Sequence, residues 1–439
     1  GFLAALEQYA SANDAELLVV PMRYKNPTSR WTASQANDET WDPLVAPYLF
    51  QARAKLNKNI VVLGDVKTQP TASSPLPGFD AITHSESGIL AHTKLQLRTV
   101  PVPSGKFPKI LTTTGACTVP NYTDSKAGKL GEFHHTLGAA LVEIDGPLFH
   151  LRQVNADKKT GAFVDLNLGY GACPDLDNRA EALITGDTHV GATDPAVERA
   201  TFGPGGIVAT LKPRVLVWND LFDGYFGNPH HGGNPFVSIA KVRSGRGDGA
   251  TEVRKAFDYV TAHTPPNTTS VIVPSNHDDF LHRWILNTDW RAAPRNAEFY
   301  LETALSMVRS TRMGLSGAEY ATPLEMLARR HFAGNDSVVV LGSDESYTIA
   351  GVEIGLHGDR GPNGARGSLK NLRRVGTKVV IGHSHSPGID EGGMQTGTST
   401  RLRLEYNHGP SSWMNTHAVV YANGKRSLIN IVRGRWRLE

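Results

Sequence analysis

The sequence predicts an α/β fold. Short apolar segments rich in Val and Ile alternate along the chain with longer stretches of helical periodicity, a pattern typical of sheets flanked by helices. The chain has 439 residues, more than one typical domain, so we expect two domains. Apolar residues make up 40% of the chain and charged residues 20%, which excludes a fibrous, coiled-coil or disordered protein.

Residues 1–178 are predicted to form an N-terminal α/β domain of unassigned role. The segment opens with a helix that has Phe2, Leu6 and Tyr9 on one face, and a second helix is expected near Leu44–Lys55. Buried strands are expected at Leu17–Pro21, Ile60–Gly64 and Ile110–Thr114, with two more inside Leu137–Val154 around a turn at Asp145-Gly146.

The polar segment Pro174–Arg179 is the expected boundary, and residues 179–439 alternate more regularly. Helices are predicted at Thr251–His263, Ala297–Met307 and Pro323–His331. Four predicted strands are each followed at once by Asp, Asn or His: Ala182–Thr185, Val215–Trp218, Ser270–Pro274 and Lys378–Ile381.

The polar residues after these strands are candidate metal ligands. Because ligands bind at the carboxyl ends of strands in α/β sheets, we expect their side chains to meet at one edge. Carboxylate, amide and imidazole donors without thiolate suit Mn, Fe, Zn or Ni. They exceed the needs of one ion, whereas two ions sharing a carboxylate would use them well. The candidates are Asp187, His189, Asp220, Asn276, His277, His383 and His385.

The order of the motifs resembles that of the calcineurin-like metallophosphoesterase superfamily. Along the chain come Asp187-x-His189, Asp220-x-x-Asp223, Asn276-His277-Asp278, a single His357, and Gly382-His383-x-His385. The resemblance covers the chain from about Ala182 to the C-terminus. It implies an αββα sandwich, here preceded by an additional α/β domain.

The resemblance also implies a binuclear site. Two divalent ions would clamp phosphoryl oxygens and offset the charge of an in-line displacement. By motif, the first ion would be held by Asp187, His189 and His385, the second by Asn276, His357 and His383, and both by the bridging Asp220.

By the same resemblance, His277 is the catalytic donor to the leaving oxygen, and Asp223 orients it. An imidazole with a pKa near neutrality suits this role. Three alternatives stay open: Asp223 could bridge the ions, and His331 or His408 could replace His357.

Three positions depart from the superfamily pattern. Asn219 and Ser275 each replace a glycine that precedes a ligand motif, so we expect shifted turns with the ligands retained. Gly224 stands where protein phosphatases of the superfamily carry an arginine that grips a phosphomonoester. This difference favours a phosphodiester substrate.

Arg360 and Arg366 are the predicted substrate-binding residues, because they follow His357 in a glycine-rich loop. Other basic residues could also track a phosphate backbone or could form a solvated face. These are Arg243, Arg246, Arg254, Lys255, Lys370, Arg373 and Arg374. His230 and His231 could reach the site or lie in a surface loop, and we expect His282 to be a packing residue.

The whole chain is similar to the pre-early DNA-transfer DNases of T-five-like tailed bacteriophages. The similarity rests on the leader domain, the run from Gly355 to Gly367 (GLHGDRGPNGARG) and the run from Gly382 to Gly388 (GHSHSPG). It implies a two-metal-dependent DNase that destroys host DNA early in infection. The expected cofactor is Mn, with Mg, Fe, Zn or Ni as alternatives; the expected partners are DNA and further copies of the chain.

Two other functions compete with a DNase. A phosphomonoesterase or small-nucleotide phosphodiesterase would have a small capped pocket, whereas a DNase would have a shallow, open and basic site. A non-catalytic scaffold with the same fold would be expected to lose ligands, and here every ligand position is filled.

Charge and cysteine content limit the partners and the compartment. The chain has 45 basic and 42 acidic residues and a net charge of +3, so DNA would be held by a local patch. Two cysteines, Cys117 and Cys173, favour a reducing compartment. No apolar run approaches the ~20 residues that cross a bilayer, so we expect no membrane partner. The expected location is the cytoplasm, that of the host bacterium if the protein is phage-encoded.

Overall fold

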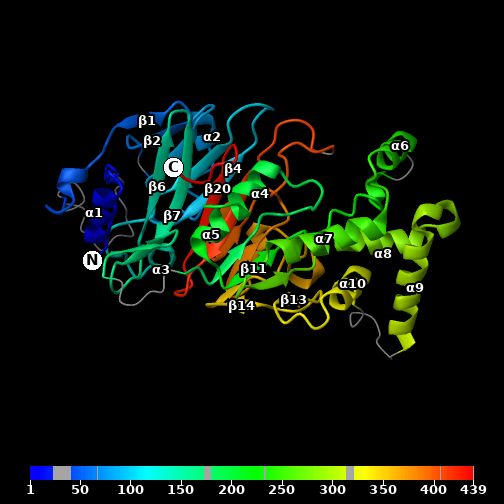
Figure 1. Cartoon of the computed structure of the whole chain (residues 1–439). Coiled ribbons are helices and arrows are strands. Elements are labelled where there is room, and N and C mark those ends of the chain that lie inside the picture. Colours follow the sequence, from blue (N-terminus) through cyan, green and yellow to red (C-terminus); the bar gives the residue numbers. More distant parts are fainter. Residues whose placement is uncertain are drawn as a thin grey trace.

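The computed structural model describes residues 1–22, 41–66, 68–172, 179–231, 234–312, 321–405 and 407–438. Two large sheets pack face to face, and helices cover their outer faces (Figure 1). The predicted α/β fold class is therefore confirmed. Most of the expected boundary segment Pro174–Arg179, namely residues 174–178, lies outside the described residues.

The six-stranded sheet has the order β13-β12-β11-β10-β19-β20. Its strands are β10 (Ala182–Ile184), β11 (Val215–Trp218), β12 (Thr269–Ile272), β13 (Val338–Val340), β19 (Asn415–Val420) and β20 (Arg426–Ile431). The first four are parallel, and β19 and β20 are antiparallel to their neighbours. Successive residues face opposite sides of the sheet: Leu183 packs toward the helices and Ile184 toward the ten-stranded sheet, and both are fully buried. Strands buried on both faces form continuous apolar runs, which made them recognisable in the sequence.

The ten-stranded sheet has the order β1-β2-β3-β5-β4-β17-β18-β16-β15-β14. Its N-terminal strands are β1 (Arg53–Asn57), β2 (Ile60–Leu63), β3 (Ser87–Leu90), β4 (Gln96–Val100) and β5 (Lys109–Thr113). The others are β14 (Thr348–Ile349), β15 (Val352–Glu353), β16 (Lys378–Ile381), β17 (Gly388–Asp390) and β18 (Gly393–Gln395). Strands β4 and β17 are antiparallel neighbours, so both predicted domains contribute to one sheet.

Two further strand pairs lie outside the large sheets. The long hairpin of β6 (Gly138–Asp145) and β7 (Leu148–Asn155) turns at Asp145-Gly146, as predicted, and β7 lies against β20. The short pair is β8 (Phe163–Asp165) with β9 (Leu168–Tyr170).

The described helices fall into an outer layer, an N-terminal group and a projecting arm (Figure 1). The outer face of the six-stranded sheet is covered by α4 (Pro195–Phe202), α5 (Ile207–Leu211), α7 (Gly249–His263), α8 (Asp278–Asn287) and α10 (Pro323–His331). The ten-stranded sheet carries α2 (Phe79–Ile82) and α11 (Leu369–Leu372). The N-terminal group is α1 (Phe2–Ala12) and α3 (Lys126–His134), and the arm ends in α6 (Pro235–Arg243) and α9 (Ala297–Arg312). In the described parts of the chain, no helix combines the length and apolar character needed to cross a bilayer.

Two predicted elements near the N-terminus are wrong. Leu17–Pro21 forms no strand, and only Val19 makes a β-bridge, to Leu49. The helix expected near Leu44–Lys55 is a single 3₁₀ turn, Ala46–Tyr48, followed by β1. Pro43 and Pro47 lack the N–H groups that an α-helix needs, and pairing with β2 draws the next residues into the sheet.

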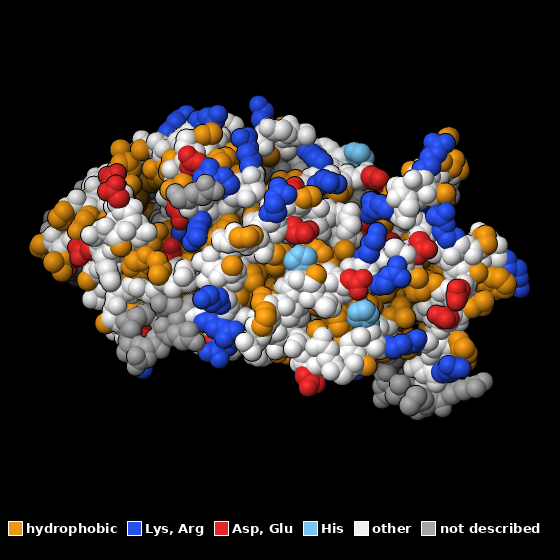
Figure 2. Space-filling model, in the orientation of Figure 1, with side chains coloured by type: hydrophobic (Ala, Val, Ile, Leu, Met, Phe, Trp, Pro, Cys, Tyr) orange, Lys and Arg blue, Asp and Glu red, His pale blue; other side chains and the backbone are white. Residues whose placement is uncertain are grey.

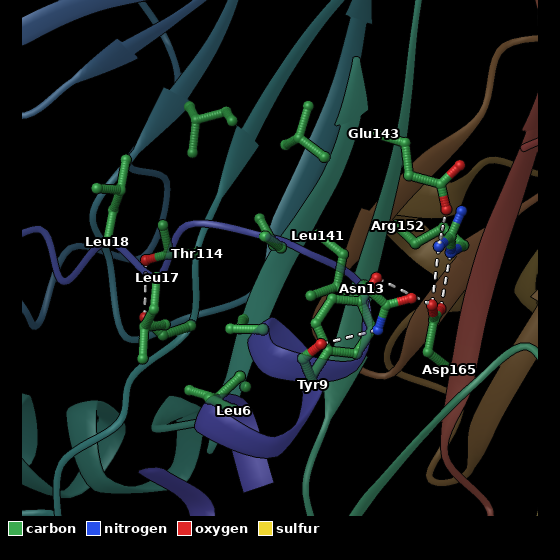
Figure 3. Close-up of a pocket in the computed structure, with 18 of the residues that line it drawn as sticks. Leu6, Tyr9, Asn13, Leu17, Leu18, Thr114, Leu141, Glu143, Arg152 and Asp165 are labelled. Carbon is green, nitrogen blue, oxygen red and sulfur yellow. Dashed lines mark hydrogen bonds and ion pairs between the residues drawn. The ribbon is translucent and has the colours of Figure 1, made fainter. Parts of the chain in front are cut away.

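A cavity of about 2090 Å³ lies between α1, the residues that follow it and the β6–β7 hairpin. Leu6, Leu17 and Leu141 line its apolar side, and a buried ion cluster lies at its polar end (Figure 3). Arg152 donates to Asp165 at 2.7 and 2.8 Å and to Glu143. None of the predicted metal ligands lines this cavity.

The Arg152–Asp165 pair should matter for folding stability. The two side chains are 3% and 7% exposed, so Asp165→Ala leaves a buried guanidinium without its main counter-charge. We expect the free energy of unfolding in urea to fall by about 3–5 kcal/mol. Asp145→Ala is the control, because Asp145 and its partner Arg435 are 46% and 33% exposed. Exposed pairs contribute ~0–1 kcal/mol, and equal losses in both variants would refute this account.

Candidate metal centre

The predicted ligands all lie just beyond the carboxyl ends of strands. Asp187 and His189 follow β10, Asp220 follows β11, Asn276 follows β12, His357 follows β15, and His383 and His385 follow β16. β10, β11 and β12 belong to the six-stranded sheet, whereas β15 and β16 belong to the ten-stranded sheet. The site therefore forms where the strand ends of the two packed sheets meet.

The first predicted ligand set forms a tight buried cluster. One ligand atom from each of Asp187, His189, Asp220 and His385 lies within 4.8 Å of the others, and all four residues are buried. His385 Nε2 is 3.1 Å from both Asp187 Oδ2 and His189 Nε2. Two imidazole nitrogens and a carboxylate oxygen thus converge on one point, as the ligands of a divalent ion do.

The second predicted set adjoins the first through Asp220. His383 Nδ1 is 2.9 Å from Asn276 Oδ1, and the His357 and His383 rings are 5.3 Å apart. Asp220 Oδ2 lies 3.3 Å from His357 Nε2 and 3.4 Å from His189 Nε2. The Asp220 carboxylate thus stands between the two sets, at the position predicted for a bridging ligand.

The electrostatics of the cluster favour a divalent cation. Burial alone would raise the pKa of Asp220, but His357, His277 and His189 lower it well below its usual range. Burial alone would lower the pKa of His357, but Asp220 and Asp187 raise it to about 10. A metal cation would take the place of these imidazole protons as the counter-charge of the carboxylates. Metal binding would therefore release protons. Asp220 Oδ1 is buried and makes no hydrogen bond to a described residue, which leaves it available to a metal.

The backbone of the site is held in an uncommon conformation. His189, Asp220, His383 and His385 all have positive φ angles, between 43° and 75°. Residues other than glycine rarely adopt such angles, and they cluster at functional sites. Gly382 is required in the same loop, because a Cβ there would lie 2.2 Å from Asp187 Oδ1.

Asp223 contacts His277 through its backbone rather than its carboxylate. His277 Nδ1 donates to the Asp223 carbonyl oxygen at 2.7 Å, which leaves Nε2 free. The Asp223 carboxylate instead lies 3.3 Å from His189 Nδ1, on the side of that ring away from Asp220. Asp223 therefore contacts His277 through its carbonyl oxygen and His189 through its carboxylate. The alternative in which Asp223 lies between the two ligand sets does not fit this arrangement.

The departures from the superfamily pattern fit into the site. Asn219 Oδ1 lies 3.4 Å from His357 Nδ1, where a glycine would offer no side chain. The Ser275 hydroxyl donates to Asp278 Oδ1 at 3.2 Å, beside a bond from its backbone N–H to Oδ2 at 3.0 Å, and these contacts fix the turn that carries Asn276 and His277. Both substitutions therefore support the ligands.

The rival histidines are kept away from the cluster or at its rim. His331 packs against Phe257 in the helical layer, and His408 is exposed in a separate loop. His230 contacts Phe280, whose ring lies 4.5 Å from the His277 ring, so His230 belongs to the rim. Of the three rival histidines His331, His357 and His408, His357 is the one that lies beside Asp220 and His383.

The predicted substrate-binding arginines lie beside the loop that carries His277. Arg360 is 3.5 Å from Asp279, at the start of α8, and half of its side chain is exposed. Arg366 forms a β-bridge with Arg360 and is exposed. Both are available to a ligand at the mouth of the site.

Sequence reasoning missed a buried histidine that supports the first ligand. The backbone N–H of Gly186 donates to His417 Nδ1 at 2.9 Å, directly before Asp187. His417 Nε2 is 2.8 Å from the Thr201 hydroxyl in α4. Accepting the Gly186 N–H requires neutral imidazole, and burial lowers the pKa of His417 to about 4. No strand-end motif marks this residue, since it lies within β19.

His417 should make folding stability depend on pH. The unfolded chain binds a proton at His417 below about pH 6.5, whereas the folded chain does so only near pH 4. This contribution to stability is therefore complete above pH 6.5 and is lost as the pH falls to 4. We expect the difference in free energy of unfolding between the wild-type protein and His417→Gln to shrink by about 3 kcal/mol over that range. Urea titrations at four pH values would measure it, and a constant difference would contradict a neutral buried His417.

Comparison with known proteins identifies a phage relative. Protein A1 of Escherichia phage T5 is 31% identical over an alignment 451 residues long, which covers 99% of this chain and 80% of the phage protein. No protein-family model matches the chain. No solved structure matches it either. The similarity spans both packed sheets and the whole candidate metal centre, and the chain belongs to the family of Protein A1 of Escherichia phage T5.

Proposed function

We propose that the protein is a two-metal-dependent phosphodiesterase of the calcineurin-like metallophosphoesterase superfamily that hydrolyses DNA. The observation that carries the proposal is the convergence of six predicted ligands from both sheets around the seventh, Asp220. Carboxylate, imidazole and amide donors in this number suit two hard or borderline divalent ions, with Mn as the first candidate. Asp187, His189, Asp220 and His385 would hold one ion, and Asn276, His357, His383 and Asp220 the other.

Bound divalent ions supply the positive charge that a phosphoryl transition state needs and lower the pKa of a water nucleophile. The protein's own residues place the substrate and the proton. His277 is the residue placed to protonate the leaving oxygen, because its Nδ1 is held by the Asp223 carbonyl and its Nε2 is free.

The accessible side of the site supports a polymeric substrate. Asp187, His189, Asp220, His357 and His385 are buried, whereas Asn276, His277 and His383 are partly exposed. A phosphodiester would therefore approach on the side of the second ligand set, where Arg360 and Arg366 are also exposed. Basic and acidic side chains are interspersed on the face shown in Figure 2, so individual arginines near the mouth would supply the attraction.

The relative from a phage fits a phage-encoded enzyme that degrades host DNA early in infection. A phosphomonoesterase or small-nucleotide phosphodiesterase is the second candidate, because the same ligand set serves either reaction. A non-catalytic scaffold is less consistent with the ligands, all of which are retained.

Cleavage of supercoiled plasmid DNA tests the proposal. We expect conversion to nicked or linear DNA in Mn²⁺ and no conversion in EDTA. His277→Ala should lower the rate by about 10²–10⁴-fold, the range for loss of a general acid. His282→Ala, a half-buried residue of α8 outside the ligand cluster, should leave the rate unchanged.

The other outcomes separate the candidate functions. Intact plasmid with turnover of small phosphodiesters or monoesters would replace the DNase by the second candidate. Metal binding without turnover of any phosphoester would indicate the scaffold. Cleavage that survives both EDTA and His277→Ala would show that a different site is responsible.

A further inference from the structure

We propose that Arg246 is a substrate-binding residue of the metal centre, whose guanidinium donates hydrogen bonds to a phosphate oxygen at the entrance of the site. Arg246 lies in the glycine-rich loop between α6 and α7, far in sequence from every ligand motif. The proposal rests on the phosphoesterase function proposed above and deepens it. The sequence favours Arg360 and Arg366 as the substrate arginines and offers Arg246 as one of several further basic residues that could track a phosphate backbone.

The guanidinium of Arg246 is fixed from two directions. Its Nη2 donates to Asp223 Oδ2 at 3.0 Å, and its Cζ lies 3.8 Å from the centre of the Tyr225 ring. A planar guanidinium stacked on an aromatic face and paired with a carboxylate loses little entropy when it binds a further anion. Arg246 is thus pre-organised.

The platform beneath Arg246 is itself rigid. The carboxylate of Glu252 accepts the backbone N–H groups of Tyr225 and Phe226 at 2.8 and 2.9 Å. The Tyr225 hydroxyl donates to Glu405 at 3.2 Å, and Tyr225 is 8% exposed. Contacts from Glu252 in α7 and from Glu405 in a C-terminal loop therefore hold the Tyr225 ring in place beneath Arg246.

Arg246 adjoins the catalytic side of the site. Asp223, its partner, contacts His189 with its other carboxylate oxygen and His277 with its backbone carbonyl. The Arg246 side chain is 38% exposed, and its Nε and Nη1 make no hydrogen bond to a described residue. The N–H groups of Nε and Nη1 therefore remain available to a ligand next to the partly exposed His277. Paired guanidinium N–H groups match the spacing of phosphate oxygens.

The residue after Asp223 cannot supply such an arginine. Gly224 has a φ of +67°, and a Cβ there would lie 2.9 Å from the Phe280 ring. Arg246 thus brings the positive charge to Asp223 from another loop. The lack of arginine at position 224 is therefore no longer an argument for a phosphodiester over a phosphomonoester substrate. The two substrate classes have to be distinguished by the size of substrate that the site accepts.

A purely structural role is the rival explanation. In that case Arg246 would only neutralise Asp223, and its loss would disturb His189 and hence metal affinity or kcat. A substrate-binding role instead affects KM and DNA affinity and leaves metal affinity intact. The two roles therefore differ in which quantity changes.

The test compares Arg246→Ala, Arg246→Lys and Arg291→Ala. Arg291 is a matched control, because it also lies over an aromatic ring, Trp290, and beside a carboxylate, Asp289, but beyond the far end of α8. We would measure kcat and KM for bis(p-nitrophenyl) phosphate in Mn²⁺, Mn²⁺ affinity by calorimetry, and binding of a fluorescein-labelled DNA oligonucleotide in EDTA by anisotropy.

For Arg246→Ala we expect KM to rise by about 10- to 100-fold, as for loss of a charge-assisted hydrogen bond, with Mn²⁺ affinity unchanged. Oligonucleotide binding should weaken about tenfold or more, Arg246→Lys should recover part of both effects, and Arg291→Ala should match the wild-type protein. Unchanged KM and oligonucleotide affinity in Arg246→Ala, or a loss of Mn²⁺ affinity instead, would overturn the proposal. If the wild-type protein hydrolyses no phosphoester while Arg246→Ala still weakens oligonucleotide binding, the proposed catalysis fails and the binding role of Arg246 stands.

Discussion

Buried negative charge is the constraint on which the arrangement of the site depends. Asp187, Asp220 and Asp223 lie together at the ends of the packed strands, almost without exposure to solvent. Carboxylates are costly to bury unless cations pair with them. The surrounding imidazoles meet part of this need, and a divalent ion at Asp220 would meet the rest. Bringing these groups so close requires a left-handed backbone at four ligands and a residue without a side chain at position 382.

The two sheets explain why the ligands come from distant parts of the chain. Parallel strands of one sheet present Asp187, Asp220 and Asn276 at a common edge, and β15 and β16 of the other sheet present the histidines that face them. The N-terminal segment takes part indirectly, because β4 pairs with β17 and extends the sheet that carries His383 and His385. The ten-stranded sheet is thus the support of half the site.

The sequence predicted the parts that depend on local pattern. Strands buried on both faces form short apolar runs, so β10, β11, β12 and β16 were found with their trailing ligands. Leu17–Pro21 has the same apolar pattern, but among the described residues it forms only a single bridge, from Val19 to Leu49, and tertiary structure decides such pairing. His417 was not recognisable as a site residue, and Arg246 was one of several basic candidates with nothing to single it out, because each reaches the site through a fold-dependent contact that leaves no motif. Spacing rules find ligands on strand ends, whereas supporting residues follow from how loops and helices pack.

Asp220 is the ligand that we propose two metal ions share. Crystals grown with Mn²⁺ and measured at its absorption edge would test this proposal most directly. We expect two anomalous peaks about 4 Å apart. One should be bound by Asp187, His189 and His385, the other by Asn276, His357 and His383, with Asp220 contacting both. A single peak that does not contact Asp220, or no peak in this cluster at saturating Mn²⁺, would contradict it.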